Sequence, residues 1–180
     1  MTKTVTRFFT IADFIEEEKW LREMHNQGWK LSKMTPPCFF TFESCEPEDV
    51  IYRLDFRDIE DGYLEMMADF GWEYAGQCFG WNYFRKASDP DASEEDENLF
   101  SDNASRAEMV QEVITTRMLP LLLLFLCVIV PNCFKFFGDA RFDTLDMVLS
   151  IVFGVLFVIY VTLLTYCGTK LRKIKQQLEI

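Results

Sequence analysis

The chain has 180 residues and a formal net charge of −11, and 49% of its residues are hydrophobic. This hydrophobic fraction excludes a disordered tail, and the acidic balance excludes a basic nucleic-acid-binding protein. The net charge is −6 over residues 1–87, −7 over residues 88–118 and +2 over residues 119–180. This distribution indicates three parts of different physical character.

Six cysteines are divided equally between residues 1–87 and the apolar C-terminal part, and no two of them form a Cys-x-x-Cys pair. This pattern predicts neither a disulfide framework nor a zinc site, and we expect no cofactor. The first residues lack the charged start, apolar stretch and cleavage site of a signal peptide. We therefore expect residues 1–87 to lie in the cytoplasm.

Residues 1–87 contain an internal repeat. The segment 18–31 (EKWLREMHNQGWKL) aligns without gaps with the segment 61–74 (DGYLEMMADFGWEY) at an offset of 43 residues. In each copy, apolar residues at spacings of three and four form one helix face, and a Gly-Trp pair then ends the helix. The repeat predicts two helices, each followed by a strand.

Further strands complete each copy. Alternating residues in 50–56 predict a strand before the second helix, with one face packed on helices and the other partly in water. Residues 5–11 are its counterpart before the first helix. We expect two strands after each helix, at residues 29–34, 38–43, 72–77 and 81–86. Two strand-helix-strand-strand units predict an α+β fold of the ferredoxin-like kind, a largely antiparallel sheet with two helices on one face.

An acidic segment, residues 88–103, follows and is punctuated by Pro90. Its composition predicts an extended, solvated linker. Ser101 or Asp102 is expected to cap a helix over residues 104–137 that continues into a first membrane span.

The C-terminal part contains two long apolar runs. Residues 119–137 are about 28 Å long as a helix, which is close to the thickness of a hydrocarbon core. Pro131 is expected to kink this helix or end it early. A second uncharged run, residues 147–167, follows a short loop, 138–146. We therefore expect a transmembrane hairpin. A helix buried in a soluble protein explains the two apolar runs less well.

Basic residues predict the orientation of this hairpin. Lys170, Arg172, Lys173 and Lys175 follow the second span, whereas the loop carries one arginine against three aspartates. We therefore expect a multi-pass protein of the plasma membrane with a basic tail, residues 168–180, and both termini in the cytoplasm. Ser150 and Gly154 form a small-xxx-small pair that would allow a homodimer, although lipid or intramolecular packing is the favoured explanation.

Several segments together resemble one known family. RFFTIADF, EKWLREMHNQGWKL, YRLDF, FGWEY, FRKA, LFSDNASRAEM and the two-span tail are similar to the bacterial domain of unknown function 2812 family. The resemblance covers almost the whole chain. It implies a membrane-anchored cytoplasmic domain of Gram-positive bacteria, some of whose genes are expected beside PadR-type transcriptional regulators. It implies no catalytic residues.

No catalytic motif is apparent in the sequence. The only histidine, His25, is expected at the surface near a helix end, and the acidic run of Glu16, Glu17 and Glu18 is expected to be a solvated face. Phosphate-binding loops and dinucleotide fingerprints are absent from the sequence. We therefore do not expect an enzyme.

Aromatic and arginine residues on the predicted sheet suggest a recognition face. RNA binding through Phe39, Trp81 and Tyr83 is disfavoured by the −6 charge of this part. A protein partner or a small ligand fits such a face better, although aromatics that simply fill a small core explain it equally well. The tentative face consists of Arg53, Arg57, Trp81, Tyr83 and Arg85.

These observations favour a membrane-anchored cytoplasmic binding or regulatory module that does not bind nucleic acid. The alternative is a structural or accessory subunit of a membrane complex that is recognised through the hairpin.

Overall fold

The computed structural model describes residues 1–89, 103–135 and 144–178, so the predicted linker and the loop between the two spans lie largely outside the described residues. The predicted capping residues Ser101 and Asp102 are also outside them. The chain divides into two compact units, Met1–Met109 and Val110–Ile180.

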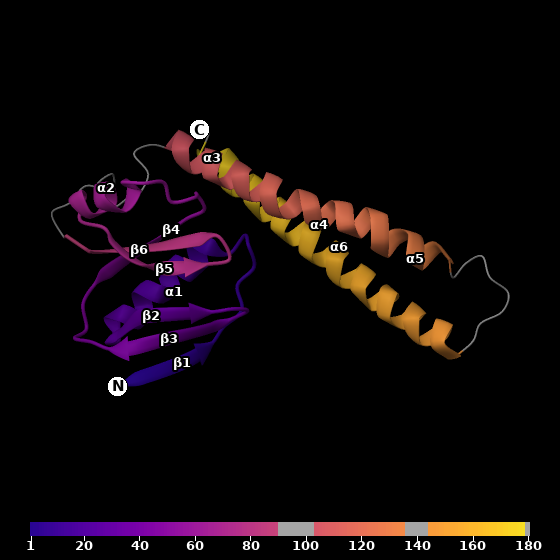
Figure 1. Cartoon of the computed structure of the whole chain (residues 1–180), viewed down its shortest axis with the longest axis horizontal. Coiled ribbons are helices and arrows are strands. Elements are labelled where there is room, and N and C mark those ends of the chain that lie inside the picture. The colour runs from indigo at the N-terminus through magenta and orange to yellow at the C-terminus, as the bar shows by residue number, and fades with distance from the viewer. Residues whose placement is uncertain (90–102, 136–143, 179–180) are drawn as a thin grey trace. The chain divides into compact units, whose positions relative to one another are not determined.

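Unit 1 contains two three-stranded antiparallel sheets (Figure 1). Sheet A has the order β1-β3-β2 and sheet B has the order β4-β6-β5, so the two halves share one strand order. In each half the third strand lies between the other two, which makes a split β-α-β arrangement. The elements are β1 Thr2–Thr6, α1 Phe14–Asn26, β2 Trp29–Thr35, β3 Phe39–Ser44, β4 Val50–Asp55, α2 Tyr63–Asp69, β5 Glu73–Cys78 and β6 Trp81–Ala87.

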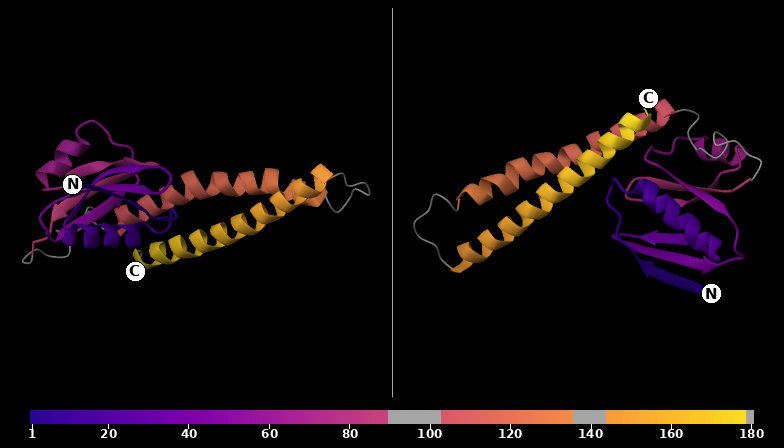
Figure 2. Two further views of the ribbon diagram at one scale, coloured as in Figure 1. Left: turned by 90° about the horizontal axis from the view of Figure 1, so that it is seen from below. Right: turned by 180° about the vertical axis from the view of Figure 1, so that it is seen from behind.

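The arrangement differs from the expected single sheet with two helices on one face. Strands β2 and β5 lie side by side, but among the described residues the backbone ladders pair strands within each sheet and not between the sheets. The left view of Figure 2 shows α1 and α2 on opposite sides of the strands. The α+β class is thus confirmed, whereas the ferredoxin-like arrangement is not.

Sheet A is covered by a helix on one face. Trp20 of α1 packs edge-on against Phe40 and Phe42 of β3, with ring centroids 4.9 and 5.6 Å apart. On the other face of β3, Phe39 is 41% exposed. Sheet A therefore has one buried face and one solvated face.

Sheet B is buried on both faces. Phe14 of α1 stacks on Trp81 of β6, with centroids 5.3 Å apart. On the opposite face, Tyr63 of α2 packs edge-on against Phe84. All six residues of β4 except Arg53 are buried, so the expected wet face of this strand is wrong. Two covering helices explain the difference, because each removes one face from water.

Strand β1 lies closer to the N-terminus than residues 5–11, where it was expected. Its last pair joins Thr6 to Phe39, the first residue of β3, and one further backbone hydrogen bond, from Arg7 to the carbonyl of Cys38, follows it. The chain then turns toward α1, and the side chain of Asp13 accepts hydrogen bonds from the backbone N–H and the hydroxyl of Thr10. Phe9 packs against Trp20 in this connection.

The two helix ends follow the predicted Gly-Trp pattern. Gly28 and Gly71 both have φ of +82°, a conformation that glycine adopts without the strain of a side chain. Each of them donates its N–H to a carbonyl of the preceding helix. Trp29 and Trp72 follow directly, and Trp72 is buried.

Residues 103–135 and 144–178 form two long helical segments that run side by side, and most of their length belongs to unit 2 (Figures 1 and 2). The chain is helical without a break from Asn103 to Lys135, which agrees with the expected continuous helix. Its parts are α3 Asn103–Val113, a π-helical turn Ile114–Met118, α4 Leu119–Leu124, a second π-helical turn Phe125–Ile129 and α5 Val130–Lys135; the second segment is α6 Thr144–Leu178.

Each π-helical turn ends two residues before a proline, Pro120 or Pro131. Proline has no N–H, so the carbonyl four residues before it would lose its helical partner. A π turn lets the next N–H along the chain bond to that carbonyl, and the helix continues. Of the two outcomes expected at Pro131, a kink or an early end, the early end is therefore wrong.

In the described part of the chain, two helices are long and apolar enough to cross a membrane, by length and composition alone. They are Ser105–Asn132, of 28 residues, and Thr144–Leu178, of 35 residues. Phe125 packs against Phe157 and Tyr160 between them, with centroids 5.2 and 6.0 Å apart.

Candidate functional site

The five residues of the predicted recognition face do not form an open face. Trp81, Tyr83 and Arg85 are 8%, 3% and 7% exposed. The side chains of Arg53 and Arg57 are 20% and 44% exposed. The prediction of one solvated surface is therefore wrong.

Strand register explains why these residues separate. Leu54 pairs with Tyr83 and Tyr52 pairs with Arg85, so all four side chains lie on the face toward α1. Arg53 pairs with Phe84 and belongs to the opposite face. Phe39, the third aromatic residue of the disfavoured RNA-binding surface, lies in sheet A.

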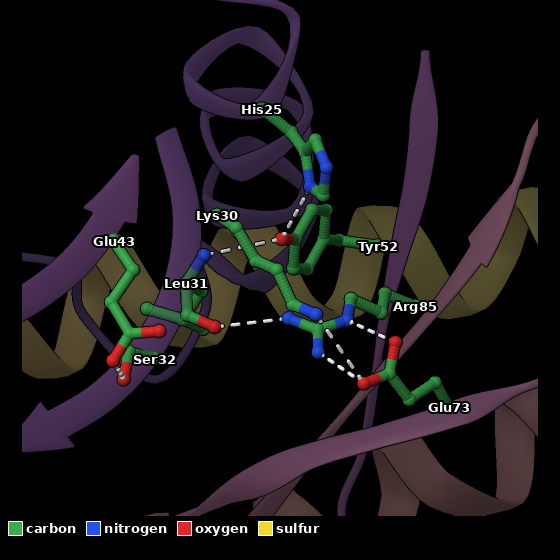
Figure 3. Close-up of polar contacts among 8 residues, drawn as sticks. All are labelled: His25, Lys30, Leu31, Ser32, Glu43, Tyr52, Glu73 and Arg85. Carbon is green, nitrogen blue, oxygen red and sulfur yellow. Dashed lines mark hydrogen bonds and ion pairs between the residues drawn. The ribbon is translucent and has the colours of Figure 1, made fainter. Parts of the chain in front are cut away.

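His25 is buried rather than on the surface. It is 5% exposed, and its Nδ1 lies 2.9 Å from the hydroxyl of Tyr52 (Figure 3). Burial lowers the pKa of His25, and the positive charge of Arg85 lowers it further. His25 is therefore neutral at neutral pH.

The hydroxyl of Tyr52 connects α1 to both sheets. Its oxygen accepts the N–H of Leu31, at 3.4 Å, and the same hydroxyl bonds Nδ1 of His25, with the donor set by the tautomer of the histidine. Burial raises the pKa of Tyr52, so the hydroxyl keeps its proton.

Arg85 of β6 links the two halves of unit 1. Its guanidinium binds the carboxylate of Glu73 through Nε, at 2.7 Å, and through Nη2. Its Nη1 donates to the carbonyl of Leu31 in β2, at 3.0 Å. The ammonium of Lys30 lies 3.7 Å from the same Glu73 carboxylate. Figure 3 shows these groups converging between β2 and β5.

A cavity of about 320 Å³ adjoins this network. We call it the junction cavity, because both halves of unit 1 contribute to it. Its walls come from the end of α1, the start of β2, the connection between β3 and β4, the starts of β4 and β5, and the end of β6. The lining residues are His25, Lys30, Cys45, Glu46, Glu48, Val50, Gly71, Glu73, Arg85, Lys86 and Ala87.

Two neighbouring glutamates of α1 form a second buried polar cluster, contrary to the expected solvated face. Glu17 is 7% exposed and accepts the hydroxyl of Tyr83 at 2.6 Å. Burial raises the pKa of Glu17 to about 7, an effect that the hydrogen bond from Tyr83 opposes. Glu17 therefore titrates near neutral pH.

Glu18 is 5% exposed and accepts the N–H of Leu54 at 2.9 Å. Leu54 lies in β4, an edge strand of sheet B, so this carboxylate takes the place of a missing strand. Arg53 and Arg106 approach Glu18 to 3.8 and 3.7 Å. Burial raises the pKa of Glu18, and both arginines oppose this shift.

The spacing of the buried polar residues along α1 predicts their burial, although their residue types do not. The buried positions of α1 recur at intervals of three and four, which marks one helix face. Glu17, Glu18 and His25 occupy this face together with apolar side chains. Their polar side chains favour exposure to solvent, whereas their spacing places them on the helix face that packs against the core.

Among the described residues, no group of three or more His, Cys, Asp or Glu side chains is placed to hold a metal ion. The junction cavity instead offers charged groups of both signs and neutral polar groups. This arrangement can bind a small polar molecule through hydrogen bonds and ion pairs.

Comparison with known proteins gives one match. No curated protein and no solved structure matches the chain. The family model described as protein of unknown function (DUF2812) matches residues 13–124, more than half of the sequence. The chain therefore belongs to this family.

Proposed function

We propose that the protein is a membrane-anchored cytoplasmic module that binds a small ligand and has a regulatory role. The observation that carries this proposal is the junction cavity. It lies where the two halves of unit 1 meet, and its wall includes two buried polar side chains, Arg85 and His25. Sites between two similar halves are common places for ligands, because both halves can respond to the occupant.

The proposed anchor is the pair of apolar helices. The basic residues after the second apolar run favour a cytoplasmic C-terminus, and an even number of spans then keeps unit 1 in the cytoplasm as well. An engineered cysteine at Asp61 should resist an impermeant thiol reagent in intact cells, whereas one at Asp143 should react. Labelling of position 61 would contradict this topology.

We also infer that the two halves of unit 1 descend from one duplicated unit. The gapless alignment of the segments 18–31 and 61–74 supports this inference, as does the shared strand order of the two sheets. A duplicated unit of this kind is also the basis of the ferredoxin-like fold.

The second candidate function is an accessory subunit of a membrane complex. The long apolar surface of α6 favours it, since Ile151 and Val158 are 61% and 63% exposed. Lipid accounts for the same exposure in a membrane helix. The cavity, in contrast, is not explained by membrane anchoring alone.

Native mass spectrometry of the full chain, released from gently solubilised membranes, separates the two functions. The binding module predicts a small molecule that co-purifies with the protein and is lost from the double variant Glu46→Lys/Glu48→Lys. An accessory subunit predicts a stoichiometric protein partner, retained by this variant, and no small molecule. The second result would contradict the proposal.

A further inference from the structure

We propose that the junction cavity binds a small zwitterion, a molecule with one ammonium and one carboxylate group such as a free amino acid. This inference rests on the proposed binding function and specifies the ligand class. The argument depends on the charges of the cavity wall, on their arrangement and on the cavity volume.

The wall formed by the strands carries a net positive charge. Arg85 and Lys30 both approach Glu73, so two positive groups share one carboxylate. The guanidinium of Arg85 is fixed by Glu73 and by the carbonyl of Leu31. Lys30 is half-buried, and its ammonium has three donors. This side of the cavity suits a carboxylate.

Another segment of the lining is acidic. Glu46 and Glu48 lie in the connection between β3 and β4, and both are exposed residues that line the cavity. Within the described part of the chain, neither forms a salt bridge. A lining that holds groups of both signs favours a ligand that carries both signs.

The total charge of the lining excludes the simpler ligand classes. Lys30, Arg85 and Lys86 contribute three positive charges, and Glu46, Glu48 and Glu73 contribute three negative ones. A dicarboxylate or a diamine would bring an uncompensated charge of two into this balanced wall. A zwitterion leaves the balance unchanged, and pairing of each of its charges with a lining group of opposite sign offsets the desolvation cost of binding.

The volume limits the ligand to a single small molecule. About 320 Å³ is at the lower end of the range for small-molecule sites. His25 adds a neutral polar group to the wall, and Val50 adds an apolar one. A short side chain on the zwitterion can occupy the space beside Val50.

Cys45 provides a direct measure of occupancy, because it lines the cavity and is half-buried. Alkylation of the full-length protein in detergent is followed at each cysteine by peptide mass spectrometry. Cys38 and Cys78 are also half-buried but do not line the cavity, so they serve as internal controls. The probes are the twenty common amino acids, succinate and putrescine.

The inference predicts that at least one amino acid slows alkylation of Cys45, roughly tenfold when present at ten times its Kd. Alkylation of Cys38 and Cys78 should keep its rate. The variant Lys30→Gln and the double variant Glu46→Gln/Glu48→Gln should each weaken this protection roughly tenfold or more. Lys33→Gln and Glu65→Gln, exposed positions outside the cavity, are matched controls and should retain full protection.

Two groups of results would overturn the inference. Protection by succinate alone or by putrescine alone would show an anion or a cation site, and the proposed binding function would stand without the zwitterion. Protection by none of these probes would remove the zwitterion as the ligand. Native mass spectrometry would still decide the binding function independently in that case.

Discussion

The two halves of unit 1 have the same strand order but differ at equivalent positions of their central strands. Phe40 and Phe42 of β3 correspond, at the offset of 43 residues, to Tyr83 and Arg85 of β6. All four side chains are buried. The first half thus has two phenylalanines where the second has a hydroxyl and a guanidinium.

The helices of the two halves differ in the same way. Helix α1 has 13 residues and buries Glu17, Glu18 and His25, whereas α2 has seven residues and buries only Met67. The polar groups of α1 meet Tyr83, Tyr52 and the edge of β4. Two halves with one strand order can therefore hold an apolar core in one and a polar network in the other, and the difference lies in a few side chains.

The largest expected effect separates the two tryptophans that end the repeats. Trp72→Ala should lower the free energy of unfolding by about 3–5 kcal/mol, because Trp72 is 4% exposed. Trp29→Ala should cost less, since Trp29 is half-buried and has Lys3 over its ring. Urea titration of the full-length protein, followed by near-UV circular dichroism, measures both. Equal losses would show that the two halves bury these positions equally.

The second effect concerns Glu18 and its counterpart in the repeat, Asp61. Glu18→Gln should destabilise the protein by roughly 3 kcal/mol, because two partly buried arginines lose their counter-charge. Asp61→Asn, at an exposed position, should change stability by less than about 0.5 kcal/mol. The same urea titration tests this contrast. If Glu18→Gln left the free energy of unfolding unchanged, the two arginines would not need this carboxylate as a counter-charge.

The third effect is a pH dependence from Glu17. Its pKa is raised from 4.5 to about 7, so its contribution to stability is fully present below pH 4.5 and is lost as the pH rises through 7. The loss amounts to roughly 3 kcal/mol at most. Glu17→Gln keeps an acceptor for Tyr83 and should abolish this dependence between pH 4.5 and 7. Glu60→Gln, at the equivalent exposed position, should retain the pH dependence. If stability still fell with rising pH in Glu17→Gln, the dependence would not come from Glu17.

The smallest effect compares the two helix-ending glycines. Gly28→Ala and Gly71→Ala should each cost about 1 kcal/mol from the positive φ. Gly28→Ala should cost more, because its new Cβ would lie 3.0 Å from the backbone carbonyl of Cys45. At Gly71 the nearest atom is the flexible Cε of Lys86, at 3.4 Å. A larger loss at Gly71 would contradict the close approach of the chain at Cys45.

Local sequence predicted most of the elements. Alternation located β4, and the Gly-Trp pairs located both helix ends and the strands after them. The predicted bounds of β1 are wrong because they depend on its pairing with β3, which lies far away in the sequence. The division into two sheets also depends on long-range packing.

The candidate site was less predictable than the fold. Arg85 and Tyr83 were assigned to an exposed face because charged and polar side chains usually contact water. Their burial depends on α1, whose packing against sheet B is set by contacts far apart in sequence. The cavity requires both halves together, so no single segment indicates it.

The most direct test of this account is the melting temperature of Arg85→Gln in the full-length protein. Arg85 and Arg22 both bind a carboxylate through two nitrogens, but the Arg22–Asp49 pair is exposed. If Arg85 is an interior link between the halves, Arg85→Gln should lower the melting temperature by roughly 10 °C. The matched control Arg22→Gln should lower it by only a few degrees, as expected for a surface pair worth about 1 kcal/mol or less. If Arg85→Gln had the same melting temperature as Arg22→Gln, Arg85 would lie on an open face, which would contradict the account.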